Sequence, residues 1–207
     1  QLARLLAELE RFGADHDQQQ RERSRRMLNI TRDTGEFLVV QILATGATRI
    51  LEIGTSNGYS TLWLAEAAGA TGGHVTTVEL SGDKAGLARA NFARAGLAER
   101  ITLLQADAGQ VLAEAAPASV DLLFLDSERS QYLDWWPALR EVLRPGGLLV
   151  VDNATSHAEE MAPFMARVVA EGWATSLVPV GNGEFLAVRR RRGGAVGRIR
   201  RRTPLAP

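Results

Sequence analysis

From residue 49 onward, short apolar segments alternate with helical stretches, and this alternation limits the possible folds more than any other feature. We expect strands at residues 49–53, 74–80, 101–105, 120–126 and 148–152, and helices at residues 59–68, 84–95, 108–115 and 132–143. Strands that alternate with helices form βαβ units, whose strands lie parallel and whose helices cover both faces of the sheet. The sequence therefore predicts an α/β fold with a doubly wound, mainly parallel sheet.

The end of this region departs from the pattern. Residues 173–180 and 184–190 are expected strands, and Gly181-Asn182-Gly183 joins them. So short a link allows only an antiparallel hairpin.

Three parts are expected along the chain. Apolar residues at helical spacing up to Phe12 predict an amphipathic helix that ends at Gly13, within an N-terminal helical cap segment of residues 1–26. The main domain covers residues 27–190. Residues 191–207 form an Arg- and Gly-rich tail with little to bury, which is expected to be disordered.

Composition limits the available chemistry. The 207 residues include no cysteine, which excludes disulfides, thiolate nucleophiles and zinc–thiolate sites. No apolar run approaches the ~20 residues of a membrane span, and the first residues do not resemble a signal peptide, so we expect a cytoplasmic protein with no membrane partner. The 24 basic and 24 acidic residues cancel, but eight arginines lie in residues 189–207, which leaves the rest of the chain acidic.

A glycine-rich turn follows the first expected strand, where a ligand can approach the backbone closely. Gly54 and Gly58 have the spacing Gly-x-x-x-Gly, whereas dinucleotide-binding turns have Gly-x-Gly-x-x-Gly. Glu52, just before the turn, is expected to place a negative charge beside the ligand, which disfavours a diphosphate and suits a cation.

Acidic residues also follow the next two strands. Glu79, 25 residues after Gly54, can accept hydrogen bonds from both hydroxyls of a ribose. Asp107 can accept one from an adenine amino group. A ligand with adenine, ribose and a positive centre but no phosphate is S-adenosylmethionine, which is the predicted cofactor.

Over roughly residues 27–190 the chain resembles the class I S-adenosylmethionine-dependent methyltransferases. It is most similar to the metal-dependent O-methyltransferases typified by the catechol and caffeoyl-coenzyme A enzymes. The motifs that carry the resemblance are Met27-Leu28-Asn29-Ile30, Glu52-x-Gly54-x-x-x-Gly58-Tyr59-Ser60, Val78-Glu79, Phe124-Leu125-Asp126 with Tyr132, and Asp152-Asn153.

The resemblance implies a Rossmann-like, seven-stranded sheet with an antiparallel final strand, and a homodimer in which the N-terminal segment covers the acceptor or builds the interface. The residues expected to bind the cofactor are Ile30, Glu52, Gly54, Thr55, Gly58, Ser60, Glu79, Leu80, Asp107, Ala108 and Asp126.

Two further acidic strand ends predict a metal site. Asp126 ends the fourth strand and Asp152-Asn153 ends the fifth, so their side chains converge if these strands are neighbours. Two carboxylates and an amide oxygen suit Mg²⁺, for which Mn²⁺ or Ca²⁺ can substitute. A bound dication would hold two vicinal oxygens of the acceptor and lower the pKa of the reacting hydroxyl.

The general base differs from the family pattern. The family has a lysine three residues after the fourth-strand aspartate, where this chain has Arg129. Arginine stays protonated, so it can stabilise a phenolate or pair with a carboxylate but cannot accept a proton. Lys84, the single lysine, is expected too far away to replace it, which leaves His157 as another candidate base.

Three functions are compatible with the sequence. The first is an S-adenosylmethionine-dependent O-methyltransferase whose small acceptor is an aromatic vicinal diol or a hydroxy-carboxylate oriented by a divalent metal. The second is a metal-independent methyltransferase of the same fold, in which Arg129 anchors an anionic acceptor. The third is a non-catalytic adenosyl-binding module, for which the arginine-rich tail binds RNA; we expect no other nucleic-acid partner.

Overall fold

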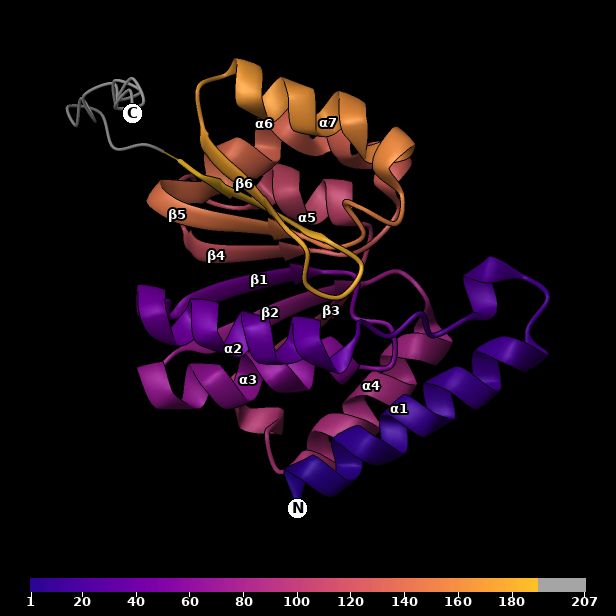
Figure 1. Cartoon of the computed structure of the whole chain (residues 1–207). Coiled ribbons are helices and arrows are strands. Elements are labelled where there is room, and N and C mark those ends of the chain that lie inside the picture. Colours follow the sequence, from indigo (N-terminus) through magenta and orange to yellow (C-terminus); the bar gives the residue numbers. More distant parts are fainter. Residues whose placement is uncertain (190–207) are drawn as a thin grey trace, which may run out of the picture.

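A seven-stranded sheet forms the centre of the computed structural model, which describes residues 1–189 (Figure 1). The strand order is β3-β2-β1-β4-β5-β7-β6, in which β1 to β5 pair in parallel and β7 lies antiparallel between β5 and β6. The predicted mostly parallel sheet with an antiparallel C-terminal hairpin is therefore confirmed. The strands are β1 (Arg49–Ile53), β2 (His74–Glu79), β3 (Ile101–Gln105), β4 (Val120–Leu125), β5 (Leu143–Val151), β6 (Ala174–Val178) and β7 (Glu184–Val188).

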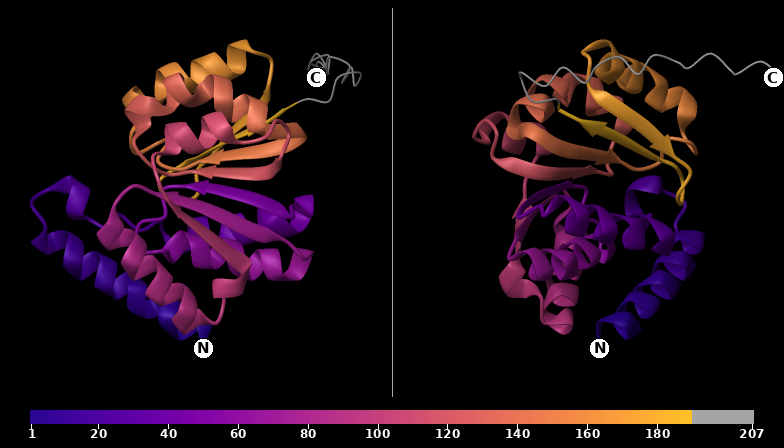
Figure 2. Two further views of the ribbon diagram at one scale, coloured as in Figure 1. Left: turned by 180° about the vertical axis from the view of Figure 1, so that it is seen from behind. Right: turned by 60° about the vertical axis from the view of Figure 1, so that its left-hand side comes forward.

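Helices cover both faces of the sheet, as predicted (Figure 2). Side chains alternate along each strand, so that Leu122 and Phe124 of β4 contribute to one core and Leu123 and Leu125 to the other. Helices α1 to α4 pack on the first face and α5 to α7 on the second. The helices are α1 (Leu2–Gln19), α2 (Arg32–Thr45), α3 (Tyr59–Thr71), α4 (Gly82–Ala95), α5 (Ala108–Glu114), α6 (Tyr132–Val142) and α7 (Ala158–Ala170), with single 3-10 turns η1 (Arg23–Arg25), η2 (Ala98–Arg100) and η3 (Arg129–Gln131).

Strand β5 begins earlier than predicted. The strand was expected at residues 148–152, but the preceding Arg144-Pro145-Gly146-Gly147 segment also belongs to it. The pairing of β4 with β5 shifts in register between Val120 and Leu122, which accommodates this irregular start.

Helix α1 is longer than predicted and belongs to the core. It continues through Gly13 because the missing side chain there leaves room for the Asn29 amide, which donates a hydrogen bond to the Leu9 carbonyl. Leu5, Leu6 and Leu9 are buried in the core on the α3 and α4 side. The first half of the segment expected to be a cap, up to Gly13, is therefore packed onto the domain.

The predicted tail, residues 191–207, and the last residue of the predicted main domain lie outside the described residues, and so does the RNA-binding alternative that depends on them. No helix within residues 1–189 has both the length and the apolar character needed to cross a membrane.

A buried aspartate ties three central strands together at the amino end of β4. Asp121 is 8% exposed. Its Oδ1 accepts hydrogen bonds from Arg144 at 2.6 Å and Arg49 at 2.8 Å, and its Oδ2 accepts from the backbone and hydroxyl of Thr48 and the backbone of Arg49. Burial alone would raise the pKa of Asp121, but the hydrogen bonds from Arg49 and Arg144 hold it far below its usual range.

We predict that Asp121→Asn lowers the free energy of unfolding by roughly 2–4 kcal/mol, because it leaves two guanidinium groups without their carboxylate. Since the folded-state pKa is lowered, the carboxylate stabilises the fold above its unfolded pKa of about 4, and this contribution is lost as the pH falls. Urea unfolding at pH 7 and at lower pH measures both effects. The exposed Asp15→Asn is the control, and equal stability of the two variants would contradict the prediction.

Candidate functional site

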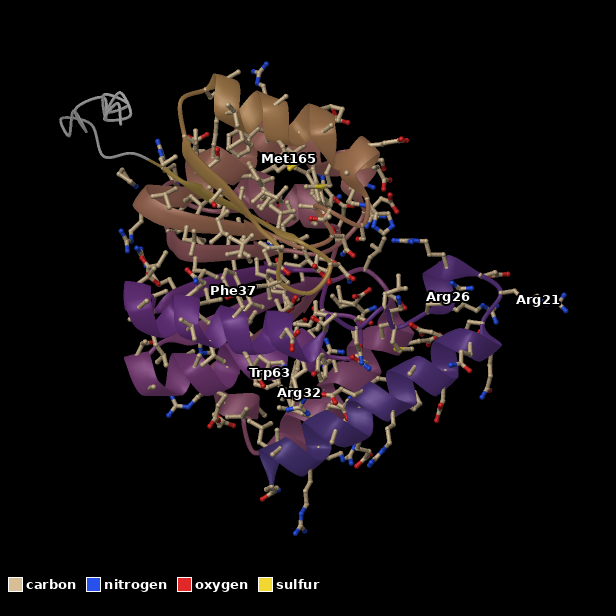
Figure 3. All side chains as sticks on the ribbon, in the orientation of Figure 1. Arg21, Arg26, Arg32, Phe37, Trp63 and Met165 are labelled. Carbon is tan, nitrogen blue, oxygen red and sulfur yellow. The ribbon has the colours of Figure 1, made fainter. Side chains whose placement is uncertain are left out.

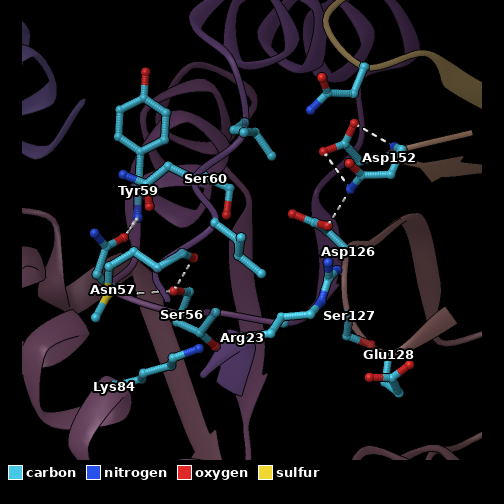
Figure 4. Close-up of a pocket in the computed structure, with 18 of the residues that line it drawn as sticks. Arg23, Ser56, Asn57, Tyr59, Ser60, Lys84, Asp126, Ser127, Glu128 and Asp152 are labelled. Carbon is cyan, nitrogen blue, oxygen red and sulfur yellow. Dashed lines mark hydrogen bonds between the residues drawn. The ribbon is translucent and has the colours of Figure 1, made fainter. Parts of the chain in front are cut away.

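A cavity of about 590 Å³ lies at the carboxyl ends of β1, β4 and β5 (Figure 4). This is the edge at which ligands bind in doubly wound sheets. Its walls come from the segment between α1 and α2, the turn after β1, the loops after β4 and β5, and the hairpin residue Asn182. Most of the predicted site residues line it: Ile30, Gly54, Thr55, Ser60, Glu79, Asp126, Arg129, Asp152, Asn153 and His157.

The two glycines of the turn after β1 have different roles. Gly54 has a φ of +104°, and a Cβ built on it would overlap the carbonyl oxygen of Asp126, so only glycine lets β1 and β4 end this close together. Gly58 has a φ of +87° and packs against Phe92 of α4 instead of lining the cavity. Gly54 therefore lines the cavity, where its contact with a ligand stays a prediction, whereas Gly58 packs α3 against α4.

Glu52 does not place its charge beside the ligand, contrary to our expectation. It is fully buried, and its carboxylate accepts hydrogen bonds from the hydroxyls of Ser60, Thr61 and Thr77. Burial raises the pKa of Glu52, and the three hydroxyls oppose that rise. Glu52 therefore acts behind the cavity wall, where it fixes the orientation of Ser60.

Glu79 lies at the cavity edge with both carboxylate oxygens held. One accepts a hydrogen bond from the Ser56 backbone and the other from the Ser81 backbone, each at 2.8 Å. Lys84, in the first turn of α4, also lines the cavity; burial lowers its pKa while Glu79 raises it. Lys84 was predicted to lie too far from the acceptor to act as its base, and its position at this edge of the cavity was not predicted.

Three other predicted cofactor residues lie outside the cavity. Leu80 is 72% exposed. Asp107 caps α5, since its side chain accepts a hydrogen bond from the Gln110 backbone at 3.0 Å, and Ala108 is the first residue of that helix. These residues do not line the cavity, and their contact with the cofactor stays a prediction.

The predicted metal residues do converge. The Asn153 side-chain nitrogen lies 3.0 Å from Oδ1 of Asp126 and 3.1 Å from Oδ2 of Asp152. Burial and the charge of Asp152 raise the pKa of Asp126 well above its ordinary value, and burial also raises the pKa of Asp152. Two crowded carboxylates that share one hydrogen-bond donor favour a cation between them.

The donor set fits a hard divalent cation with open positions. Residues 1–189 contain no group of three or more His, Cys, Asp or Glu side chains arranged to hold a metal. The set here instead has two carboxylates and one amide. If the side-chain amide of Asn153 were flipped, its oxygen would occupy the position where its nitrogen now contacts both carboxylates. All three side chains would then offer oxygen atoms to a cation.

Glu184, at the start of β7, is a buried acid that the sequence analysis missed. Its Oε1 accepts a hydrogen bond from the Thr34 hydroxyl at 2.8 Å. Burial, together with the charge of Asp152, raises the pKa of Glu184 to about 10, so the group is protonated at neutral pH. A single acid in an otherwise apolar strand was the signal that could have revealed it.

The two candidate catalytic residues both line the cavity but differ in charge and in their hydrogen-bond partners. The Arg129 side chain is 6% exposed, and its Nε pairs with Glu160 at 2.6 Å. His157 precedes α7 and hydrogen-bonds Ser156 through Nδ1 at 2.9 Å. Burial and the charge of Arg129 lower the pKa of His157, so its imidazole is neutral at pH 7.

The segment between α1 and α2 supplies a wall that the sequence analysis anticipated only at Ile30. The Asp17 carboxylate holds this segment, because it accepts hydrogen bonds from the backbones of Met27 at 2.6 Å and Leu28 at 2.9 Å. The Ser56 hydroxyl donates to the Met27 carbonyl at 2.6 Å, which joins the segment to the turn after β1. Arg23, on η1, also faces the cavity.

Comparison with known sequences identifies relatives over most of the chain. The sequence model of the O-methyltransferase family matches residues 2–168. A catechol O-methyltransferase of Mycobacterium tuberculosis is 39% identical over 127 residues, covering 60% of this chain and 56% of the relative. A Mycobacterium avium protein described as an O-methyltransferase is 33% identical over 174 residues, covering 77% of this chain and 78% of the relative. The chain spans a little over half the length of the catechol O-methyltransferase.

Solved structures have the same architecture. An O-methyltransferase from Bacillus cereus, in complex with SAH, is 25% identical with a TM-score of 0.74, covering 90% of each chain. A protein from Klebsiella pneumoniae described as an O-methyltransferase is 29% identical with a TM-score of 0.75, covering 92% of this chain and 90% of the other. Sequence and fold agree, and the chain belongs to the O-methyltransferase family.

Proposed function

We propose that the cavity binds S-adenosylmethionine and that the protein transfers its methyl group to a hydroxyl of a small acceptor. The observation that carries this proposal is the meeting, in one cavity, of the Gly54 turn, the Glu79 carboxylate and the corner formed by Asp126, Asp152 and Asn153. Family membership and the SAH complex of the Bacillus cereus relative support the choice of cofactor.

On this proposal the cofactor lies along the turn after β1. Gly54 lets the ligand approach the backbone, and Glu79, held by two backbone N–H groups, keeps its remaining lone pairs for the ribose hydroxyls. Ile30, Thr55 and Ser60 complete this wall.

The acceptor lies at the acidic corner. Asp126, Asp152 and Asn153 would hold Mg²⁺, or Mn²⁺ or Ca²⁺, which when bound orients the acceptor oxygens and lowers the pKa of the reacting hydroxyl. His157, neutral at pH 7, is the group on this side that can accept the hydroxyl proton. The hydroxyl oxygen then forms a bond to the methyl carbon as the carbon–sulfur bond breaks, leaving S-adenosylhomocysteine.

The metal-independent alternative rests on one observation. The Asn153 amide already donates hydrogen bonds to both carboxylates, so the corner is closed by the protein's own side chain. In that case Arg129 would hold an anionic acceptor through the guanidinium nitrogens that do not contact Glu160. Homodimer formation and a cytoplasmic location stay predictions from the sequence.

We predict that Gly54→Ala abolishes S-adenosylmethionine binding, because its Cβ would overlap the Asp126 carbonyl and separate the two strand ends. Isothermal titration calorimetry measures the loss, expected to exceed about 100-fold in Kd, or roughly 2.7 kcal/mol. Gly86→Ala on α4 is the matched control, since nothing lies within 4 Å of its new Cβ. Unchanged binding by Gly54→Ala would contradict the proposed cofactor position.

We predict that Asp152→Ala lowers kcat/KM for methylation of catechol by on the order of 100-fold or more, while S-adenosylmethionine binding persists, because the acceptor corner loses a carboxylate. EDTA should cause a similar loss that Mg²⁺ restores. The exposed Glu159→Ala is the control. Methyl transfer that neither EDTA nor Asp152→Ala affects would overturn the metal proposal and favour the metal-independent alternative.

A further inference from the structure

We propose that the preferred acceptor carries a carboxylate and that Arg23 binds it, so that small hydroxylated carboxylates are better substrates than neutral diols. The proposal rests on the proposed methyl transfer and adds to it a substrate class and a specificity-determining residue. Lysine and arginine side chains that line the cavity are Arg23, Lys84 and Arg129.

Among the arginine and lysine side chains that line the cavity, Arg23 is the one best able to pair with a bound anion. Arg129 pairs with Glu160 at 2.6 Å, and Lys84 lies on the Glu79 side, where the cofactor is proposed to bind. Within residues 1–189, Arg23 forms no ion pair within 4.0 Å and no side-chain hydrogen bond.

The side chain of Arg23 lies where it could contact the acceptor. Its side chain extends across the cavity from the side of Lys84 toward Asp126 (Figure 4). Its charge opposes the rise in the pKa of Asp126 and contributes to lowering the pKa of His157 and Glu160, which places it within electrostatic reach of the acceptor corner.

The backbone that carries Arg23 is held in place. Asp17 accepts hydrogen bonds from the Met27 and Leu28 backbones, and Arg26 Nε donates to the Gln20 carbonyl at 3.0 Å. The anchored ends of this short segment keep η1 over the cavity, so the guanidinium is presented from a fixed wall.

The charge balance of the filled site favours an anion beside Arg23. A bound dication would neutralise the two carboxylates of Asp126 and Asp152. The sulfonium of the cofactor and the Arg23 guanidinium would then be positive charges beside the acceptor. A carboxylate on the acceptor can form two parallel hydrogen bonds with a guanidinium, which a neutral diol cannot.

The test compares methylation of 3,4-dihydroxybenzoate and catechol, two diols that differ in one carboxylate. We expect the native protein to favour 3,4-dihydroxybenzoate in kcat/KM by about 10- to 50-fold, and Arg23→Gln to remove most of this preference through KM. Arg21→Gln is the matched control, because Arg21 lies on the same segment and points away from the cavity (Figure 3). Arg23→Lys should restore part of the preference, since it keeps the charge without the bidentate geometry.

Calorimetry on the S-adenosylhomocysteine-loaded protein measures the same preference without turnover. Equal affinity for the two diols, or a preference that Arg23→Gln leaves intact, would overturn the role of Arg23. An equal loss for both diols would also overturn it, because Arg23 would then act on the fold or the cofactor. Failure of the native protein to bind S-adenosylmethionine would instead overturn the proposed function.

Discussion

The close approach of the ends of β1 and β4 is the constraint on which the site depends. Gly54, at positive φ, leaves no side chain between itself and the Asp126 carbonyl, and the Asp126 backbone donates a hydrogen bond to Ile53 at 3.0 Å. This contact places the turn that faces the proposed cofactor directly beside the acidic corner that faces the proposed acceptor. Methyl transfer needs donor and acceptor in line and within contact distance, so a packing feature of the backbone sets the geometry of the chemistry.

The sheet and the acidic corner could be predicted because both follow from periodicity. Parallel strands bring their carboxyl ends to one edge, so Asp126 and Asp152, each directly after an apolar strand, had to meet once β4 and β5 were neighbours. The orientation of the Glu52 side chain follows from the alternation of side chains along β1. Leu51 and Ile53 point into the core under α5 to α7, so Glu52 points to the opposite face of the sheet. Its three hydroxyl partners come from α3 and β2, however, and nothing in their spacing revealed that they would meet its carboxylate.

The rest of the site depends on contacts that the periodicity of apolar residues in helices and strands does not predict. Asp17 holds the backbones of Met27 and Leu28, ten and eleven residues further along, in a segment without regular structure. Glu184 meets Thr34 across 150 positions. Both contacts join elements whose relative placement is known only once the domain has packed. The family resemblance therefore placed Ile30 at the cavity, but neither the position of Arg23 there nor the burial of Glu184 beside Thr34 was predicted.

Arg129 stands where the family has a lysine, and this replacement changes which side chain in the site can accept a proton. A lysine can lose its proton in a buried position, whereas Arg129 keeps its charge and stabilises it with Glu160. The acceptor must then give its proton to another group, and His157 is kept neutral by burial and by the charge of Arg129 itself. In the proposed mechanism the fixed guanidinium would contribute to catalysis indirectly, because the charge that prevents Arg129 from acting as a base keeps the His157 imidazole able to accept a proton.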